Sequence, residues 1–301
     1  MRVSKMSDLH LEFHDIELPG GDILILAGDC FVAACLREWR NDAGNRSLHK
    51  RMVRFAREEL SKYKKVFVVK GNHEHYGEVF EDVSDLLREF FAEFAPHVTL
   101  LDNSSEIYEG VAFVGSTLWA PHGHGKYAAL EIGRCLSDFQ RISTWMPYRD
   151  GRRKIPCGKV RSWTVVDAYS EHGKAKKYLQ KALGFTKENS IPAIVITHHA
   201  PSYLSTTMRF KYYDESMDEA FYSNQHKLIE DNPQIYMWVH GHSHNSCHYQ
   251  IGNTKIISNQ RGYFPDERCS RGFEPDAEDF DLEEAKQHWR TGHVLRKPEE
   301  V

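Results

Sequence analysis

The stretch KKVFVVKGNHE, residues 64–74, joins an apolar run to an abruptly polar ending. The run is rich in valine and apolar on both faces, which is typical of a strand in a sheet covered on both sides. Gly71 permits a sharp turn, and Asn72 and His73 follow where the strand would reach the surface. One such ending is weak evidence of function, so the other strands of the chain decide what it means.

Apolar runs of this kind recur and alternate with helical patterns. They occupy residues 1–6, 22–29, 64–72, 110–117, 191–199, 235–242 and 254–260. Helical patterns, strong in the first two cases and weaker in the others, lie at residues 46–63, 78–94, 174–183 and 217–229. Alternating strands and helices predict an α/β or α+β domain with a layered sheet core.

Composition narrows the classes of function. The chain has 301 residues, 41% of them hydrophobic, and a net charge of -4, as in a globular protein with no global attraction for nucleic acid. No apolar run approaches the roughly 18 residues that span a bilayer, and the first ten residues turn polar too early for a signal peptide. We therefore expect a cytoplasmic protein with no membrane partner. Six cysteines without a CxxC pair fit neither a zinc knuckle nor a disulfide scaffold.

Two segments depart from the alternation of strands and helices. Residues 120–165 contain Gly, Pro, Trp and a basic run but no clear strand, so we expect an insertion over one face of the core. Residues 265–301 hold eleven acidic and six basic side chains, a net of -5 by subtraction. This composition predicts an acidic, partly helical tail on the surface.

Five predicted strands end in side chains that bind metals. They contribute Asp8 and His10, then Asp29, Asn72 and His198, and finally His242 and His244. Parallel neighbours lie about 4.8 Å apart, so loops at their carboxyl ends bring such residues into one coordination sphere. Alternate residues of an extended segment point the same way, which pairs the members of D-x-H and of H-x-H. The glycines before Asp29, Asn72 and His242 allow close backbone approach.

The number and type of these donors predict two metal ions. A zinc site is typically satisfied by four ligands, or by three and a water. Seven side chains, with one carboxylate shared, make two sites about 3.5–4 Å apart, the spacing of two-metal phosphoryl enzymes. The mixed oxygen and nitrogen donors suit Mn, Fe or Zn better than Mg or Ca, and we expect Mn to serve in vitro.

The ordered motifs DxH, GD, GNHE, THH and GHSH run from residue 8 to residue 244 and resemble those of the calcineurin-like metallophosphoesterase superfamily. The resemblance implies an α/β fold, a four-layer α/β/β/α sandwich over residues 1–264, with a dinuclear metal site at the carboxyl ends of the strands. It implies that Asp29 bridges the two ions. The remaining ligands would divide into Asp8, His10 and His244 for one ion, and Asn72, His198 and His242 for the other.

By the same resemblance, His73 is not a ligand but a proton donor or a stabiliser of the transition state. The protein-phosphatase branch has a phosphate-binding Asp-Arg-Gly after GD, whereas Cys30 follows Asp29 here and no such arginine is present. THHAPS and the late N-x-R-G-Y are more similar to uncharacterised bacterial and phage-type phosphoesterases. In these two motifs, Arg261 is a candidate phosphate contact, and His199 is a candidate for contacting substrate or orienting a ligand.

Each motif alone has a structural explanation, since Asp8 could cap a helix and Asp29 could occupy a turn. If every motif were purely structural, five unrelated motifs would have to occur in the family's order by chance. We therefore favour a metal-dependent phosphoesterase. We expect it to hydrolyse phosphate mono- or diesters, with small nucleotide-type substrates first. A nuclease acting on DNA or RNA is the alternative, and a non-catalytic scaffold is a third reading that retention of all ligands and His73 argues against.

A basic run in the insertion bears on the choice of substrate. Residues 149–161 hold six basic side chains against one Asp, with Trp145, Tyr148 and Trp163 nearby. This combination fits either a solvated loop or a lip that gathers phosphate and stacks a nucleobase. A histidine pair at residues 122 and 124 imitates the metal motif, but we expect a loop there without a third metal.

Overall fold

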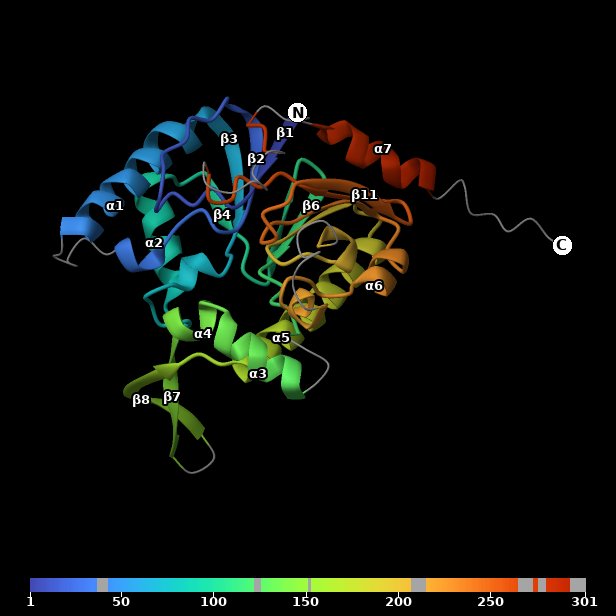
Figure 1. Ribbon diagram of the computed structural model, residues 1–301. Coiled ribbons are helices and arrows are strands. Elements are labelled where there is room, and N and C mark those ends of the chain that lie inside the picture. The colour runs from blue at the N-terminus through green and yellow to red at the C-terminus, as the bar shows by residue number, and fades with distance from the viewer. Residues whose placement is uncertain are drawn as a thin grey trace.

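The computed structural model describes residues 1–36, 43–121, 126–150, 153–206, 215–264, 273–275 and 280–292. Its strands form two sheets and one separate hairpin (Figure 1). The first sheet has the order β13-β1-β2-β3-β4. Its strands are β1 (Arg2–Met6), β2 (Gly21–Ala27), β3 (Tyr63–Val69), β4 (Val98–Leu100) and β13 (Phe280–Asp281). The first four are parallel, and β13 pairs antiparallel with β1.

The second sheet has the order β11-β12-β10-β9-β6-β5. Its strands are β5 (Ser104–Tyr108), β6 (Val111–Ser116), β9 (Ala193–Thr197), β10 (Ile235–Val239), β11 (Cys247–Ile251) and β12 (Thr254–Ser258). The central strands β6, β9, β10 and β12 are parallel, and the outer strands β5 and β11 are antiparallel to their neighbours. The sequence patterns identified the four central strands, whereas the shorter edge strands lack a distinctive apolar run.

The two sheets pack face to face because their strands are apolar on both sides. In β2, Ile23 and Ile25 face the other sheet, while the alternate Leu24 and Leu26 face the helices. Across the interface, the ring of Phe67 stacks on a phenylalanine of β6 at 4.1 Å between centroids. Successive side chains of a strand point to opposite faces, so the order of residues in β2 determines which side chains meet the other sheet and which meet the helices.

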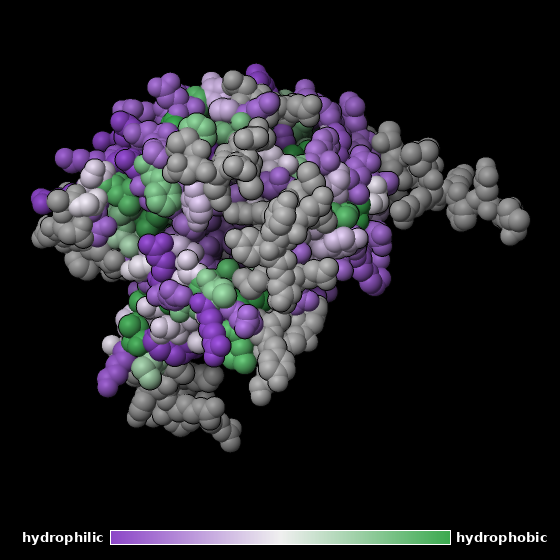
Figure 2. Space-filling view, in the orientation of Figure 1, coloured by the Kyte–Doolittle hydropathy of each residue, from purple (hydrophilic) through white to green (hydrophobic). Residues whose placement is uncertain are grey.

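Helices cover the outer faces of both sheets. Figure 1 shows α1 (Ala43–Arg54) and α2 (Val83–Phe94) beside the first sheet, and α5 (Val165–Glu188) and α6 (His226–Glu230) beside the second. The molecule is therefore the four-layer α/β/β/α sandwich that the motif resemblance implied. Figure 2 shows mainly hydrophilic residues on the described surface in this view, as expected when the apolar faces lie between layers.

Short helical turns link the main elements. They are η1 (Ala33–Cys35), η2 (Phe55–Glu59), η3 (Leu60–Lys62), η4 (His73–His75), η5 (Tyr203–Ser205) and η6 (Glu215–Ala220). The helix expected at residues 46–63 thus ends in a π turn and a 3₁₀ turn before β3, and η4 carries the residues that follow Asn72.

The insertion is more ordered than its sequence suggested. It contains α3 (Lys126–Cys135), α4 (Asp138–Arg141) and a hairpin of β7 (Ser143–Asp150) and β8 (Arg153–Ser162), which projects from the body (Figure 1). The expectation of no clear strand was wrong, because these strands pair with each other and need no apolar run of the kind that marks a buried sheet. Trp163 is 2% exposed and packs 4.4 Å from the Trp119 ring, so stacking of a nucleobase on Trp163 is contradicted. The side chain of Tyr148, most of the basic run and residues 122 to 125 lie outside the described residues.

The described part of the C-terminal segment packs against the domain. β13 extends the first sheet, and α7 (Leu282–Gly292) follows it directly. Phe280, Leu282 and Ala285 are buried in the cluster between the two sheets. The expected helix is present, but these apolar side chains anchor residues 280–292 to the core, so this part is not a free tail. Within the described ranges, no helix is long and apolar enough to cross a membrane.

Candidate metal centre

The loops at the carboxyl ends of the strands bend sharply at the candidate ligands. Five of the candidate ligands have positive φ angles, a conformation that is uncommon in residues other than glycine and that concentrates at functional sites. They are Asp8 (52°), His10 (46°), Asp29 (53°), His242 (72°) and His244 (49°). The chain therefore adopts an unfavourable backbone conformation repeatedly along one edge, where these side chains meet.

Glycines make the close approach of these loops feasible. A Cβ atom on Gly71 would overlap the Asp29 carboxylate, and one on Gly28 would overlap the His198 ring. A Cβ atom on Gly241 would lie 2.6 Å from Asp8 Oδ2. The sequence prediction that glycine is needed before Asp29, Asn72 and His242 for close approach is confirmed.

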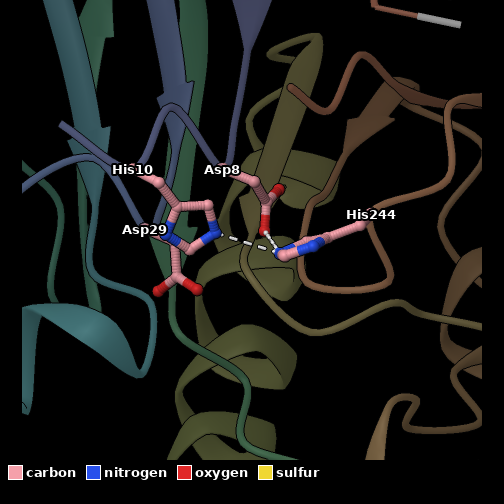
Figure 3. A group of neighbouring side chains, drawn as sticks. All are labelled: Asp8, His10, Asp29 and His244. Atoms are coloured by element: carbon pink, nitrogen blue, oxygen red, sulfur yellow. Dashed lines mark hydrogen bonds and ion pairs between the residues drawn. The ribbon is translucent and has the colours of Figure 1, made fainter. Parts of the chain in front are cut away.

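The first group of donors consists of Asp8, His10, Asp29 and His244 (Figure 3), whose potential ligand atoms all lie within 4.8 Å of one another. His244 Nε2 lies 3.0 Å from His10 Nε2 and 3.4 Å from Asp8 Oδ1. His10 Nδ1 faces a Glu12 carboxylate oxygen at 3.1 Å, and a carboxylate only accepts, so Nδ1 carries the hydrogen. In the neutral ring, Nε2 then presents a lone pair, and this convergence of acceptors fits a cation.

The second group of donors consists of Asp29, His198 and His242, with Asn72 beside it. His198 Nδ1 donates to the Ala27 carbonyl oxygen at 2.9 Å, which turns Nε2 toward Asn72 Oδ1 at 3.0 Å and Asp29 Oδ2 at 3.3 Å. His242 Nε2 is buried and has no hydrogen-bond partner among the described residues. The Asn72 and Asp29 oxygens and the His242 nitrogen thus gather as acceptors around one point, so the donor set fits a second cation next to the first.

A carboxylate of the insertion fixes the orientation of Asn72. The Asn72 Nδ2 atom donates to Asp138 Oδ1 at 2.9 Å and to the Tyr76 hydroxyl at 3.0 Å. Tyr76 in turn donates to the same Asp138 oxygen at 2.7 Å. Because Asp138 and Tyr76 hold the amide nitrogen, the amide oxygen of Asn72 points toward His198 and the second donor group, where it could bind a metal ion.

The electrostatics of the cluster favour ionised carboxylates. Burial alone would raise the pKa of Asp29, but His198 and His73 outweigh it and hold this pKa well below its usual range. Burial also opposes protonation of His198, yet Asp29 and Asp8 raise its pKa to about 10. The pKa of His242 is lowered well below its usual value by burial and by neighbouring histidines. The carboxylates thus stabilise positive charge at the centre of the site, and the imidazole of His242 stays neutral.

Glu74, the last residue of the GNHE motif, holds two of the loops together. Its carboxylate accepts hydrogen bonds from the backbone N–H groups of Asp29 (3.0 Å), Cys30 (2.8 Å), Phe31 (3.0 Å) and Gly71 (2.6 Å). Burial, with Asp29 adding to it, raises the pKa of Glu74 to about 7. The loop after β2 is therefore tied to the loop after β3, which fixes Asp29 against Asn72.

His73 lies at the open side of the cluster. Its Nδ1 atom is 2.7 Å from Glu12 Oε1, and its Nε2 atom is 3.1 Å from the Tyr263 hydroxyl and 4.0 Å from Asp29 Oδ2. Burial lowers the pKa of His73, but Asp29 and Glu12 outweigh it and raise this pKa. His73 is in neither of the donor groups that contain Asp29, although its ring nitrogen lies within the same distance limit of His10 and Glu12.

A cavity of about 130 Å³ opens onto these residues. Asp29, His73 and Tyr263 line it on the side of the sheets, and residues 136–138 of the insertion line it on the other. A second cavity of about 290 Å³ is lined by Lys70, Asp102 and other residues, none of which is a candidate ligand. Of these two cavities, the first is therefore the one that reaches the donor cluster.

The two remaining candidates have other contacts. The Arg261 guanidinium donates to the backbone carbonyl oxygens of Leu9 (3.1 Å), His14 (3.3 Å) and Asp15 (2.9 Å), so it holds the loop that carries His10. His199 is fully buried, and its ring lies 4.1 Å from that of His242, which fits the orienting role.

Reasoning from sequence missed four polar residues of the site. They are Glu12, Glu74, Asp138 and Tyr263. Glu12 and Glu74 stand within or beside the recognised motifs, and Tyr263 belongs to the N-x-R-G-Y stretch, so a signal was available for these three. Asp138 has no such signal, because it lies in the insertion, far along the chain from Asn72.

Three comparisons place the chain among known proteins. Residues 3–246 match the family model described as calcineurin-like phosphoesterase. An uncharacterized protein of Acanthamoeba polyphaga mimivirus is 29% identical over 284 residues, which cover 87% of this chain and 92% of that protein. The solved structure of phosphopantetheinyl hydrolase from Mycobacterium tuberculosis is similar in fold, with a TM-score of 0.60 and 16% identity over 87% of this chain and 89% of that one.

Proposed function

The chain belongs to the calcineurin-like phosphoesterase family and is a metal-dependent phosphoester hydrolase, and we propose that its substrates are small phosphate mono- or diesters of the nucleotide type. The observation that carries this proposal is the convergence of two groups of metal donors on Asp29, beside His73 and at the base of one cavity.

Two divalent ions fit the donor set, one with Asp8, His10 and His244 and the other with Asn72, His198 and His242, and Asp29 is common to both. When bound, such ions supply Lewis-acid activation of a water molecule and neutralise charge on the phosphate. Mn is our first choice for reconstitution, and Fe or Zn are the alternatives.

The chain's own groups then complete the reaction. His73 Nε2 faces the cavity, because Nδ1 is engaged by Glu12. From this position a protonated His73 donates to the leaving oxygen or to the charged oxygens of the transition state. The Tyr263 hydroxyl, 3.1 Å from the same nitrogen, lies where it can contact the phosphate. Asp138 and Tyr76 keep the Asn72 oxygen directed into the centre.

The experiment is hydrolysis by metal-stripped protein to which Mn²⁺ is returned, with bis(p-nitrophenyl) phosphate compared with p-nitrophenyl phosphate. We expect Mn²⁺-dependent turnover of at least one ester, abolished in Asp29→Asn and retained in Asp85→Asn, which alters a side chain that is 79% exposed on α2. Turnover of the diester would indicate a phosphodiesterase and make cyclic nucleotides the next substrates to test. Turnover of the monoester alone would indicate a phosphatase. Absence of both with Mn²⁺ bound contradicts the proposal.

A nuclease is the second candidate, since a hairpin with a basic sequence projects beside the part of the insertion that lines the cavity. Single-stranded DNA and RNA belong in the same assay. Cleavage of a polymer at least as fast as of the small diester would favour the nuclease.

A further inference from the structure

We propose that Glu12 is a positioning residue that orients the metal ligand His10 and the proton donor His73 together, so that one carboxylate links metal binding to proton donation. This inference rests on the proposed function, because it assigns His10 and His73 their roles there.

One oxygen of Glu12 meets both imidazoles. Glu12 Oε1 lies 2.7 Å from His73 Nδ1 and 3.1 Å from His10 Nδ1. The two rings approach edge to face, with their centroids 4.5 Å apart. A carboxylate oxygen has two lone pairs and only accepts hydrogen bonds, so it can hold both Nδ1–H groups at once.

The direction of both hydrogen bonds determines what each ring presents to the site. With hydrogen on Nδ1, the Nε2 atom of His10 is directed at His244, within the first donor group. In the same way, the Nε2 atom of His73 is directed at Tyr263 and the cavity. Fixing the far nitrogen of a ligating or catalytic histidine in this manner selects its tautomer and its ring orientation.

The backbone that carries Glu12 is held in place, as a positioning residue requires. The Glu12 side chain is 13% exposed. The backbone on either side is fixed by two arginines, because Arg51 donates to the carbonyl oxygens of Leu11 (2.8 Å) and Glu12 (3.0 Å) and Arg261 binds the rest of the loop. In the described part of the chain, the ion pairs of the Glu12 carboxylate are with His10 and His73.

The first readout is metal affinity, which does not depend on turnover. Loss of a carboxylate that supports a ligating histidine typically weakens metal binding about 10–100-fold. We expect Glu12→Ala to weaken Mn²⁺ binding by such a factor and His73→Ala to leave it nearly unchanged. Glu17→Ala, which removes an exposed carboxylate from the same loop, is the matched control. Unchanged Mn²⁺ affinity in Glu12→Ala would refute the link to His10.

The second readout is the dependence on the leaving group, in which phenyl and p-nitrophenyl esters are compared. Phenolate is a poorer leaving group than p-nitrophenolate, so the phenyl ester needs more assistance from an acid and its rate should fall further in Glu12→Ala. In a His73→Ala background, Glu12→Ala should slow the two esters equally. Glu12→Gln, which keeps an acceptor oxygen of the same size, should restore part of the rate. An equal loss for both esters would refute the link to His73.

The third readout keeps the inference separate from the proposed function. In ¹⁵N-labelled protein loaded with diamagnetic Zn²⁺, we expect Nδ1–H resonances for His10 and His73 that shift or vanish in Glu12→Gln. If they do so while no ester is hydrolysed, Glu12 positions the histidines and the proposed function is wrong. If both resonances persist unshifted in Glu12→Gln, the inference is overturned whatever the enzyme hydrolyses.

Discussion

Replacement of Asp138 tests whether the insertion is part of the metal centre. Asp138 is 2% exposed, and one of its oxygens accepts hydrogen bonds from Asn72 (2.9 Å) and from Tyr76 (2.7 Å). Asp138→Ala leaves both buried donors without this acceptor. Each such donor costs about 1–3 kcal/mol, and loss of a carboxylate whose pKa is raised by burial offsets part of this cost. The metal-free protein should therefore lose at most roughly 2–6 kcal/mol of its free energy of unfolding. Tyr76→Phe removes one hydrogen bond and should cost about 1 kcal/mol.

The effect on metal binding should be confined to one site. Without Asp138, the Asn72 amide can rotate and present its nitrogen to the ion. We therefore expect the ion held by Asn72, His198 and His242 to bind about 10–100-fold more weakly, as when other outer partners of ligands are removed. The ion assigned to Asp8, His10 and His244 should be affected much less, because Asp138 accepts its hydrogen bonds from Asn72 and Tyr76 beside the other ion.

A Mn²⁺ titration followed by calorimetry, with urea unfolding of the metal-free variants, measures both quantities. In an Asn72→Ala background, Asp138→Ala should weaken the second ion no further, because the two residues act through one hydrogen bond. Equal weakening of both ions, or an additive loss in the double variant, would refute the reasoning.

Three further predictions concern other parts of the site. His73→Ala should lower turnover about 10²–10⁴-fold with Mn²⁺ content unchanged by metal analysis; a matching loss of metal would make His73 a ligand. Gly71→Ala should weaken Mn²⁺ binding because its Cβ displaces Asp29, whereas Gly173→Ala, which meets no atom within 4 Å, should leave binding unchanged and stability equal or higher; equal effects in a binding titration would contradict this. Burial raises the pKa of Asp102, but Lys70 and Ser84 outweigh it and lower this pKa below 3.8 in the folded protein, so its contribution is complete above pH 3.8 and is lost as the pH falls through the folded value. Asp102→Asn should thus be about 1 kcal/mol less stable at pH 7, with the difference in the free energy of unfolding narrowing below pH 4 in urea unfolding; a difference independent of pH would exclude this carboxylate as its source.

The sequence predicted the parts of the molecule that depend on local patterns. The central strands were identified because each is an apolar run with a polar ending, and the seven donors lie at those endings. The hairpin of β7 and β8 and the edge strands escaped prediction, since pairing at an edge leaves little trace in composition. The anchoring of Phe280 and Leu282 between the sheets was equally hidden within an acidic segment.

The supporting residues show why a site is harder to predict than its ligands. Glu12 was visible two residues after His10, but nothing local indicates that it also reaches His73, 61 positions away. Asp138 meets Asn72 across 66 positions and from a segment with no recognised motif. Such contacts depend on how the loops are folded over the sheet edge, which a single sequence does not specify.

The donors of each group come from both halves of the sandwich. Asp8 and His10 follow the first sheet and His244 follows the second, while Asn72 follows the first and His198 and His242 follow the second. Each bound ion would therefore link the two sheets. Because it binds only the folded protein, it would raise the free energy of unfolding by about 2.7 kcal/mol at a free-ion concentration of 100 Kd. Chelation should accordingly speed hydrogen exchange in strands of both sheets together, and neither half of the chain should hold an ion by itself.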